Sequence, residues 1–183
     1  PVLYSPSPAG SFCLHNPNLT FMEIYDHFST GELLATHLRD IAHTPKHLRF
    51  FTAFGIEDLY DFEDRLSSVS GTILIAIDSN ESDTTDNRAD SLIDRAAYSF
   101  VVARNTNSDR TSTIQEAVRK CKLLAKQIRN RLFLTSSLLG IIDHDTQITG
   151  IGPIGDNFYG VILTFYLNVP ESYFIDPKFW KED

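Results

Sequence analysis

The segment that most constrains the fold is residues 146–169, TQITGIGPIGDNFYGVILTFYLNV, which joins turn residues to an alternating apolar run. In the second half of this segment every other residue is large and apolar, a period of two that suits a half-buried strand. The buried face would carry Val161, Leu163, Phe165, Leu167 and Val169. Asp156 and Asn157, flanked by Gly155 and Gly160, supply turn chemistry before this strand. The segment therefore predicts a β-hairpin.

Composition is typical of a single globular domain. The 183 residues, 42% of them hydrophobic and 13 of them Phe, are enough to bury a core without disulfides. No apolar run approaches the roughly 18 residues that a membrane-spanning helix requires, so we expect no membrane association. The two cysteines, Cys13 and Cys121, lie far apart in unlike contexts. This spacing argues against a disulfide framework or a thiolate metal site and favours a reducing compartment.

The N-terminal third predicts an arm followed by two helices. Residues 1–18 are rich in Pro, Ser and Asn without periodicity, which is typical of an arm that orders only by packing on another surface. A helix is expected from Asn18, with Asn18 or Thr20 as its cap and an interruption at Gly31. A second helix is expected from Ile56 to Leu66, with several acids on its outer side.

The rest of the chain predicts strands, one long helix and a tail. Thr72 to Asp78, TILIAID, is apolar on both faces, which is typical of a central strand, and Ala97 to Arg104 alternates like a second strand. The residues between them, 79–96, are predicted to form a long polar and acidic connection. Thr111 to Leu134 carries an apolar stripe at helical spacing and is the clearest helix. The tail, 170–183, follows the last strand.

Together these elements predict an α+β domain in which a single antiparallel sheet of about four strands carries its helices on one face. The domain organisation would be an N-terminal arm at 1–18, a folded domain at 19–169 and a C-terminal aromatic tail at 170–183. The aromatic residues of the tail are Tyr173, Phe174, Phe179 and Trp180. Because they follow the last predicted strand, we expect these side chains to pack back on the folded domain or onto a neighbouring molecule.

Charge is distributed unevenly along the chain. Residues 110–134 hold seven Lys/Arg and one acid, a net charge of +6, and since the whole chain carries −8 the remainder carries −14. Nonspecific nucleic-acid binding needs a continuous basic track, which this balance does not provide. It suits self-association, with the basic helix of one copy facing acids of another, although a solvated helix face is the alternative. The candidate interface residues are Arg119, Lys120, Lys122, Lys126 and Arg129, together with the tail aromatics.

Motifs that would indicate catalysis or cofactor binding are incomplete. Residues 150–155 match G-x-G-x-x-G, but a turn and a strand follow instead of the helix that would bind a pyrophosphate. An EF-hand starting at Asp78 would place Asp83 and Ala89 where Gly and Glu are required. The sequence Asp-His-Asp at 143–145 favours a tight turn over a zinc site. We therefore expect no cofactor, no metal and no enzymatic activity. The alternative is a small intracellular enzyme or ligand-binding domain that uses this turn or the acidic connection.

Four segments carry a family resemblance: TILIAID, AYSFVVARN, the helix from Thr111 to Leu134, and ITGIGPIGDNFYGVILTFYLNV. Their order resembles that of the tail-terminator or tail-completion proteins of tailed bacteriophages, over roughly Phe21 to Val169. The resemblance implies a small α+β protomer that closes into a ring, usually a hexamer. Such a ring caps the last ring of the tail tube, stops its growth and presents a surface to the head connector.

The resemblance also implies a location and a set of partners. The protein would be assembled in the host cytoplasm and reside in the tail or neck of the virion, where DNA passes through the lumen only as cargo. An acidic lumen would suit that passage, because it repels the phosphate backbone. Residues 79–96 would reach the neighbouring ring or the lumen. Another neck or head-completion component is the nearest alternative.

Overall fold

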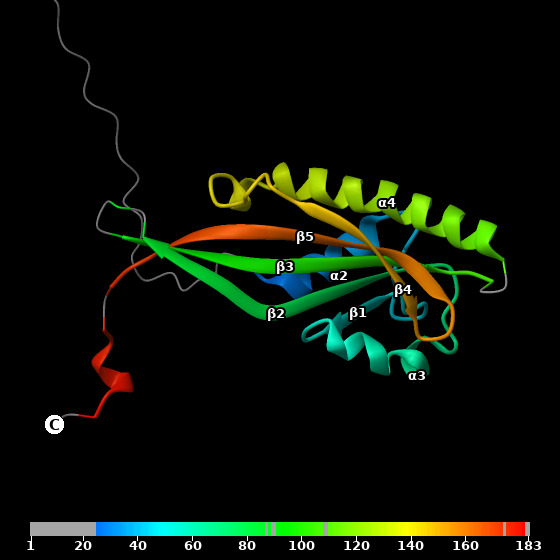
Figure 1. Ribbon diagram of the computed structural model, residues 1–183, viewed down its shortest axis with the longest axis horizontal. Coiled ribbons are helices and arrows are strands. Elements are labelled where there is room, and N and C mark those ends of the chain that lie inside the picture. The colour runs from blue at the N-terminus through cyan, green and yellow to red at the C-terminus, as the bar shows by residue number, and fades with distance from the viewer. Residues whose placement is uncertain (1–24, 87, 89–90, 108–109, 174, 182–183) are drawn as a thin grey trace, which may run out of the picture.

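The computed structural model describes residues 25–86, 88, 91–107, 110–173 and 175–181. One five-stranded sheet forms the centre of the molecule, with the strand order β1-β2-β3-β5-β4 (Figure 1). The strands are β1 (Phe50–Ala53), β2 (Thr72–Asp86), β3 (Leu92–Asn105), β4 (Gln147–Ile154) and β5 (Phe158–Glu171). β1 runs parallel to β2, and the other pairs are antiparallel. The α+β class is confirmed, but the expected purely antiparallel sheet of about four strands is wrong.

Helices cover both faces of the sheet, so the prediction of helices on one face is also wrong. α2 (His27–His37) and α4 (Thr111–Phe133) lie on one face, over a core that includes Phe100 and Phe165. The 3-10 helix η1 (Glu57–Asp61) and the short α3 (Glu63–Leu66) lie on the other, where Leu59 and Phe62 join a second core with Ile75. The physical reason is β1. Because β1 and β2 are parallel, the chain between them must cross back over the sheet, and η1 and α3 make that crossing.

Gly31 lies inside α2 and does not interrupt it. The helix begins at an N-cap, Asp26, whose carboxylate accepts a hydrogen bond from the Ser29 backbone at 2.9 Å. A Cβ at Gly31 would lie 2.8 Å from the Phe50 ring and 3.0 Å from the Phe100 ring. The missing side chain therefore allows the helix to lie directly on the sheet. The expected caps at 18 and 20, like the proposed arm at 1–18, lie outside the described residues.

The polar segment 79–96 is largely strand, and the predicted connection is wrong. β2 continues to Asp86 and pairs there with the first half of β3, which begins at Leu92 and pairs in turn with the end of β5. We call this three-stranded extension the ribbon: residues 81–86, 92–97 and 166–171. It projects from the body of the molecule (Figure 1). The register shifts between Asp78 and Glu81, where the ribbon leaves the body.

The closing hairpin and the long helix are confirmed. β4 and β5 pair in an antiparallel fashion, and the five apolar residues expected on the inner face of β5 are all buried. A Cβ at Gly160 would lie 1.9 Å from the Val102 carbonyl oxygen, so only glycine fits at this point of β5. A short 3-10 helix, η2 (Ser136–Leu138), links α4 to the hairpin. The glycines of residues 150–155 thus shape a hairpin.

A buried histidine is held between α2 and the sheet. His27 Nε2 lies 3.0 Å from the Ser99 carbonyl oxygen, to which it must donate, so Nδ1 accepts from the Tyr25 hydroxyl at 2.9 Å. The ring also contacts Phe100, with centroids 4.5 Å apart. Burial lowers the pKa of His27 from 6.5 to about 4, which keeps the ring neutral at physiological pH.

Candidate functional site

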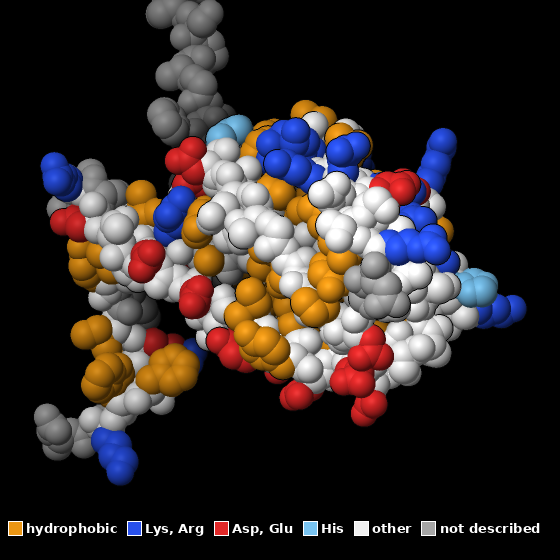
Figure 2. Space-filling model, turned by 45° about the vertical axis from the view of Figure 1, so that its right-hand side comes forward, with side chains coloured by type: hydrophobic (Ala, Val, Ile, Leu, Met, Phe, Trp, Pro, Cys, Tyr) orange, Lys and Arg blue, Asp and Glu red, His pale blue; other side chains and the backbone are white. Residues whose placement is uncertain are grey.

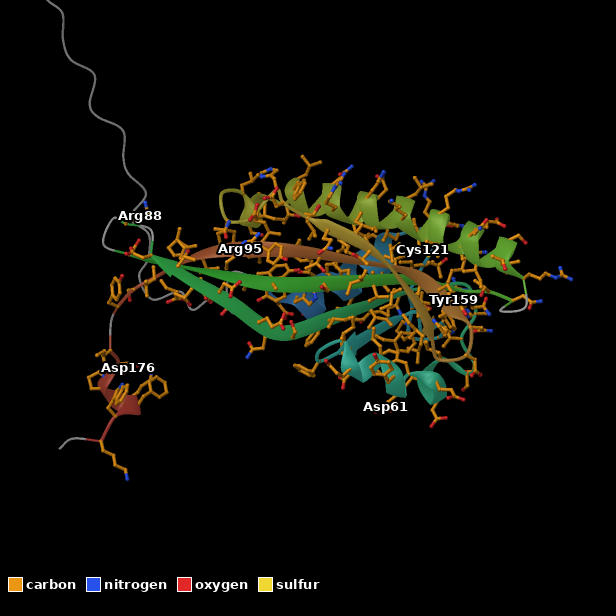
Figure 3. The ribbon with its side chains drawn as sticks, viewed as in Figure 1. Asp61, Arg88, Arg95, Cys121, Tyr159 and Asp176 are labelled. Atoms are coloured by element: carbon orange, nitrogen blue, oxygen red, sulfur yellow. The ribbon has the colours of Figure 1, made fainter. Side chains whose placement is uncertain are left out.

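The predicted basic surface is present on the outer side of α4. The inner side of this helix packs on the sheet and buries residues such as Cys121, Ala125 and Ile128. Cys121 lies close to Tyr159 of β5 (Figure 3), with its Sγ 3.9 Å from the Tyr159 carbonyl oxygen. The outer side bears four cations spaced three, four and three residues apart, which places them along one stripe. We call this stripe the basic ridge: Arg119, Lys122, Lys126 and Arg129. The first three are exposed and Arg129 is half-buried.

Lys120 is placed apart from the basic ridge. Its Nζ lies 2.6 Å from Asp40 Oδ1, in an ion pair with the segment that follows α2. Within the basic ridge, the Arg129 guanidinium donates two hydrogen bonds to Asn130 Oδ1 at 3.2 and 3.0 Å. Of the five predicted basic residues, four therefore share one surface, and the fifth is engaged in holding α4 to the body.

A cleft of about 800 Å³ opens on the opposite face of the sheet. The cleft lies between η1, which covers one end of that face, and the ribbon. Ser99 and Thr164 form part of its floor, and their hydroxyl oxygens are 3.0 Å apart. Its acidic side chains are Glu57 from η1 and Glu81 and Asp83 from β2. We call this concave surface the acidic cleft. The sequence reasoning missed it because the residues that line it come from four separate segments.

Arg95 is the only cation among the described residues that line the acidic cleft. Its guanidinium lies 3.7 Å from the centroid of the Tyr166 ring and donates to Asp143 Oδ2 from Nε at 3.2 Å and from Nη2 at 3.0 Å. A hydrogen bond from the Asp145 backbone, and then Arg95, lower the pKa of the Asp143 carboxyl. Because Asp143 neutralises Arg95, the cleft keeps its acidic character.

The Asp-His-Asp segment forms the expected turn. Asp143 Oδ1 accepts from the Asp145 backbone at 2.9 Å, and the His144 ring lies 4.8 Å from the ring of Phe133. The Asp143 carboxylate and the His144 ring therefore have different partners. Over the part of the chain that the structure describes, no group of three or more His, Cys, Asp or Glu side chains could hold a metal.

The aromatic tail does not pack back on the core. Tyr173, Phe179 and Trp180 are 62%, 77% and 69% exposed, and Ile175, which the sequence reasoning omitted, is equally accessible. Phe174 lies outside the described residues. The 3-10 helix η3 (Pro177–Phe179) shapes the tail, with Asp176 accepting from the Lys178 backbone at 3.0 Å. Figure 3 shows Asp176 beyond the end of the ribbon, far from Asp61 and Cys121 in the body.

Cationic and anionic side chains gather on different sides of the molecule. Figure 2 shows Lys and Arg side chains gathered over the side where α4 lies, and Asp and Glu side chains along the side where η1 and α3 lie. Phe54, Ile56 and Tyr60 add exposed apolar surface around η1. The single helix expected from Ile56 to Leu66 is instead the 3-10 helix η1 followed by the short α3, and Tyr60 within η1 is 83% exposed.

Comparison of the chain with protein-family models and with curated proteins gave no match. None of the described helices is long and apolar enough to cross a bilayer.

Proposed function

We propose that this chain is a structural protein that acts by packing against copies of itself and against neighbouring components of a larger particle. The aromatic tail carries the proposal. Tyr173, Phe179 and Trp180 are at least 62% exposed on a segment that leaves the body at the end of the ribbon. Grouped apolar side chains of this size mark contact sites. A partner surface could cover them without disturbing the core, because neither core cluster of the described residues includes a residue of the tail.

Within this class, we assign the chain to the tail or neck of a tailed bacteriophage. It would form a ring, expected to be a hexamer, that caps the tail tube and meets the head connector. Support comes from the element order: an apolar central strand, a second strand, a long helix and a closing hairpin, as in the tail-terminator proteins that the sequence resembles. The acidic excess outside α4 suits a lumen through which DNA passes as cargo.

Two alternatives remain with distinct expectations. A different neck or head-completion protein would use the same surfaces, but it would bind the connector and not the tail tube. A small enzyme or ligand-binding domain would use the Asp-His-Asp turn or the acidic cleft. Asp143 is already bound by Arg95 and by the Asp145 backbone, and the His144 ring lies against Phe133, so the turn does not present a carboxylate aligned with a base and we do not favour this alternative.

The test is the oligomeric state of the full chain, measured by native mass spectrometry over a wide concentration range and by negative-stain electron microscopy. We expect closed rings of one size that bind purified tail tubes. The double variant Phe179→Ala/Trp180→Ala should keep its fold and lose binding to the tube, the connector or other copies. The matched control is Leu134→Ala/Leu139→Ala, an exposed apolar pair in the body, which should bind normally. A monomer at every concentration, both alone and with tail tubes, would refute the proposal.

A further inference from the structure

We propose that the basic ridge of one copy docks into the acidic cleft of the next copy, so that the chain associates head to tail. This inference rests on the proposed self-assembling function and names the surfaces that carry it. The basic ridge is Arg119, Lys122, Lys126 and Arg129, and the acidic cleft presents Glu57, Glu81 and Asp83. A second copy is the occupant that the charges select, because α4 concentrates the positive charge of a chain that is otherwise acidic.

The charges on both surfaces are available for a partner. Asp40, an acid beside α4, is already paired with Lys120 of that helix at 2.6 Å. Arg95, the cation inside the cleft, is stacked on Tyr166 and paired with Asp143 at 3.0 Å. The internal ion pairs thus neutralise Asp40 near α4 and Arg95 inside the cleft, the two charges that would oppose docking. The ridge and the cleft acids lie at the surface, where water and a partner can reach them.

The spacing of the charges is also compatible. Lys122 and Lys126 are one helical turn apart, which separates their attachment points by about 6 Å along the helix axis. Glu81 and Asp83 are two residues apart on one strand and project from the same face, a separation of about 7 Å. Two lysines on a helix and two acids on a strand can therefore pair side by side. Leu123, 60% exposed beside the ridge, would add an apolar contact to the interface.

The position of the two surfaces determines the kind of assembly. α4 packs on one face of the sheet and the acidic cleft opens on the other, so the ridge of a copy cannot reach its own cleft. A contact between two different patches is heterologous, and repeated heterologous contacts build a ring when the rotation closes. The proposed contact would therefore build a ring, and not a two-fold dimer, if the rotation between copies closes.

The experiment exchanges the charges of the two surfaces in the full chain. The ridge variant is Arg119→Glu/Lys122→Glu/Lys126→Glu, and the cleft variant is Glu57→Lys/Glu81→Lys/Asp83→Lys. Each variant alone is expected to lose the oligomer and run at monomer mass. An equimolar mixture of the two variants should recover the oligomer. The ridge variant then carries two acidic surfaces and the cleft variant two basic ones, so every contact between the two variants joins opposite charges. Circular dichroism and thermal melting check the fold. The control Arg39→Glu/Lys46→Glu/Arg131→Glu makes the same charge change as the ridge variant at residues that belong to neither the ridge nor the cleft.

The outcomes separate this inference from the proposed function. If the wild type is oligomeric and either reversed variant stays oligomeric, head-to-tail docking through these surfaces is wrong while self-assembly stands. If the cleft variant keeps its oligomer and loses only tube binding, the cleft belongs to a different protein. Two monomeric variants that do not recover on mixing would also overturn the pairing. If the wild type is monomeric with and without tail tubes, both proposals fail. Wild-type association should weaken from 0.1 to 1 M salt, as the screening length falls from about 10 to 3 Å.

Discussion

The two faces of the central strands are built from neighbouring residues and yet differ in their environment. On the face below α4, Tyr98 and Phe165 are buried in the core. On the other face, Ser99 and Thr164, each one position along the same strands, are half-exposed in the acidic cleft. The covered face is sealed by the chain itself, whereas the open face has helices over only one end. The difference teaches that one face of the sheet is fully used for the core of the chain itself, whereas the other keeps an open concave surface.

The largest expected effect comes from truncating the covered face. Phe165→Ala removes a fully buried ring and should lower the free energy of unfolding by about 3–5 kcal/mol. Thr164→Ala, its neighbour on the open face, loses one hydroxyl contact to Ser99 and should cost about 1 kcal/mol. Urea denaturation measures both values. Equal losses at the two positions would contradict the distinction between the faces.

The next effect is a pH dependence confined to the covered face. Because burial lowers the pKa of His27 from 6.5 to about 4, the unfolded chain binds a proton in this range and the folded chain does not. The stability from the neutral ring is fully present above pH 6.5 and should fall by roughly 3 kcal/mol as the pH drops to 4.

Urea denaturation across this pH range measures the slope, and His27→Gln should flatten it while the amide still donates to Ser99. The matched control is His37→Gln, which alters an exposed histidine on the same helix and should keep the slope. An unchanged slope in the His27 variant would show that the ring is not responsible.

The smallest effect belongs to the open face. Arg95→Ala removes the stacking on Tyr166 and the ion pair with Asp143, both partly exposed, and should cost about 1 kcal/mol. Arg95→Lys should recover only part of this loss, because an ammonium does not stack as a planar guanidinium does. Arg95→Ala also makes the cleft more acidic, so association measured by sedimentation should be at least as strong as in the wild type. Weaker association would mean that Arg95 itself contacts the partner.

The sequence was sufficient for elements whose burial follows a simple period. α4 and β5 each have one buried side, so an apolar stripe at helical spacing and strict alternation identified them. β1 has only four residues and offers too few positions for a pattern. The ribbon was missed for a different reason: the β2 residues from Ser79 to Asp86 are exposed, so no apolar alternation marks them as a strand.

The candidate site was predictable only where one element builds it. The basic ridge lies on a single helix, so spacing along the sequence places its charges together. The acidic cleft joins η1, β2, β3 and β5, whose proximity depends on the sheet order. The contacts of Arg95 likewise join distant parts of the chain. Tyr166, on which its guanidinium stacks, lies 71 residues further along the sequence. Pairings of this kind follow from tertiary structure and leave no local pattern.

The register of β2 has a consequence for how copies can avoid the wrong assembly. β1 pairs with β2 only as far as Ile77, so within the described residues the backbone of β2 from Ser79 to Asp86 has a free outer side. Such an edge is a template on which another strand can add, and unlimited addition leads to fibrils. Glu81, Asp83 and Asp86 lie along this stretch. Two such edges repel each other, which discourages open-ended stacking through the ribbon.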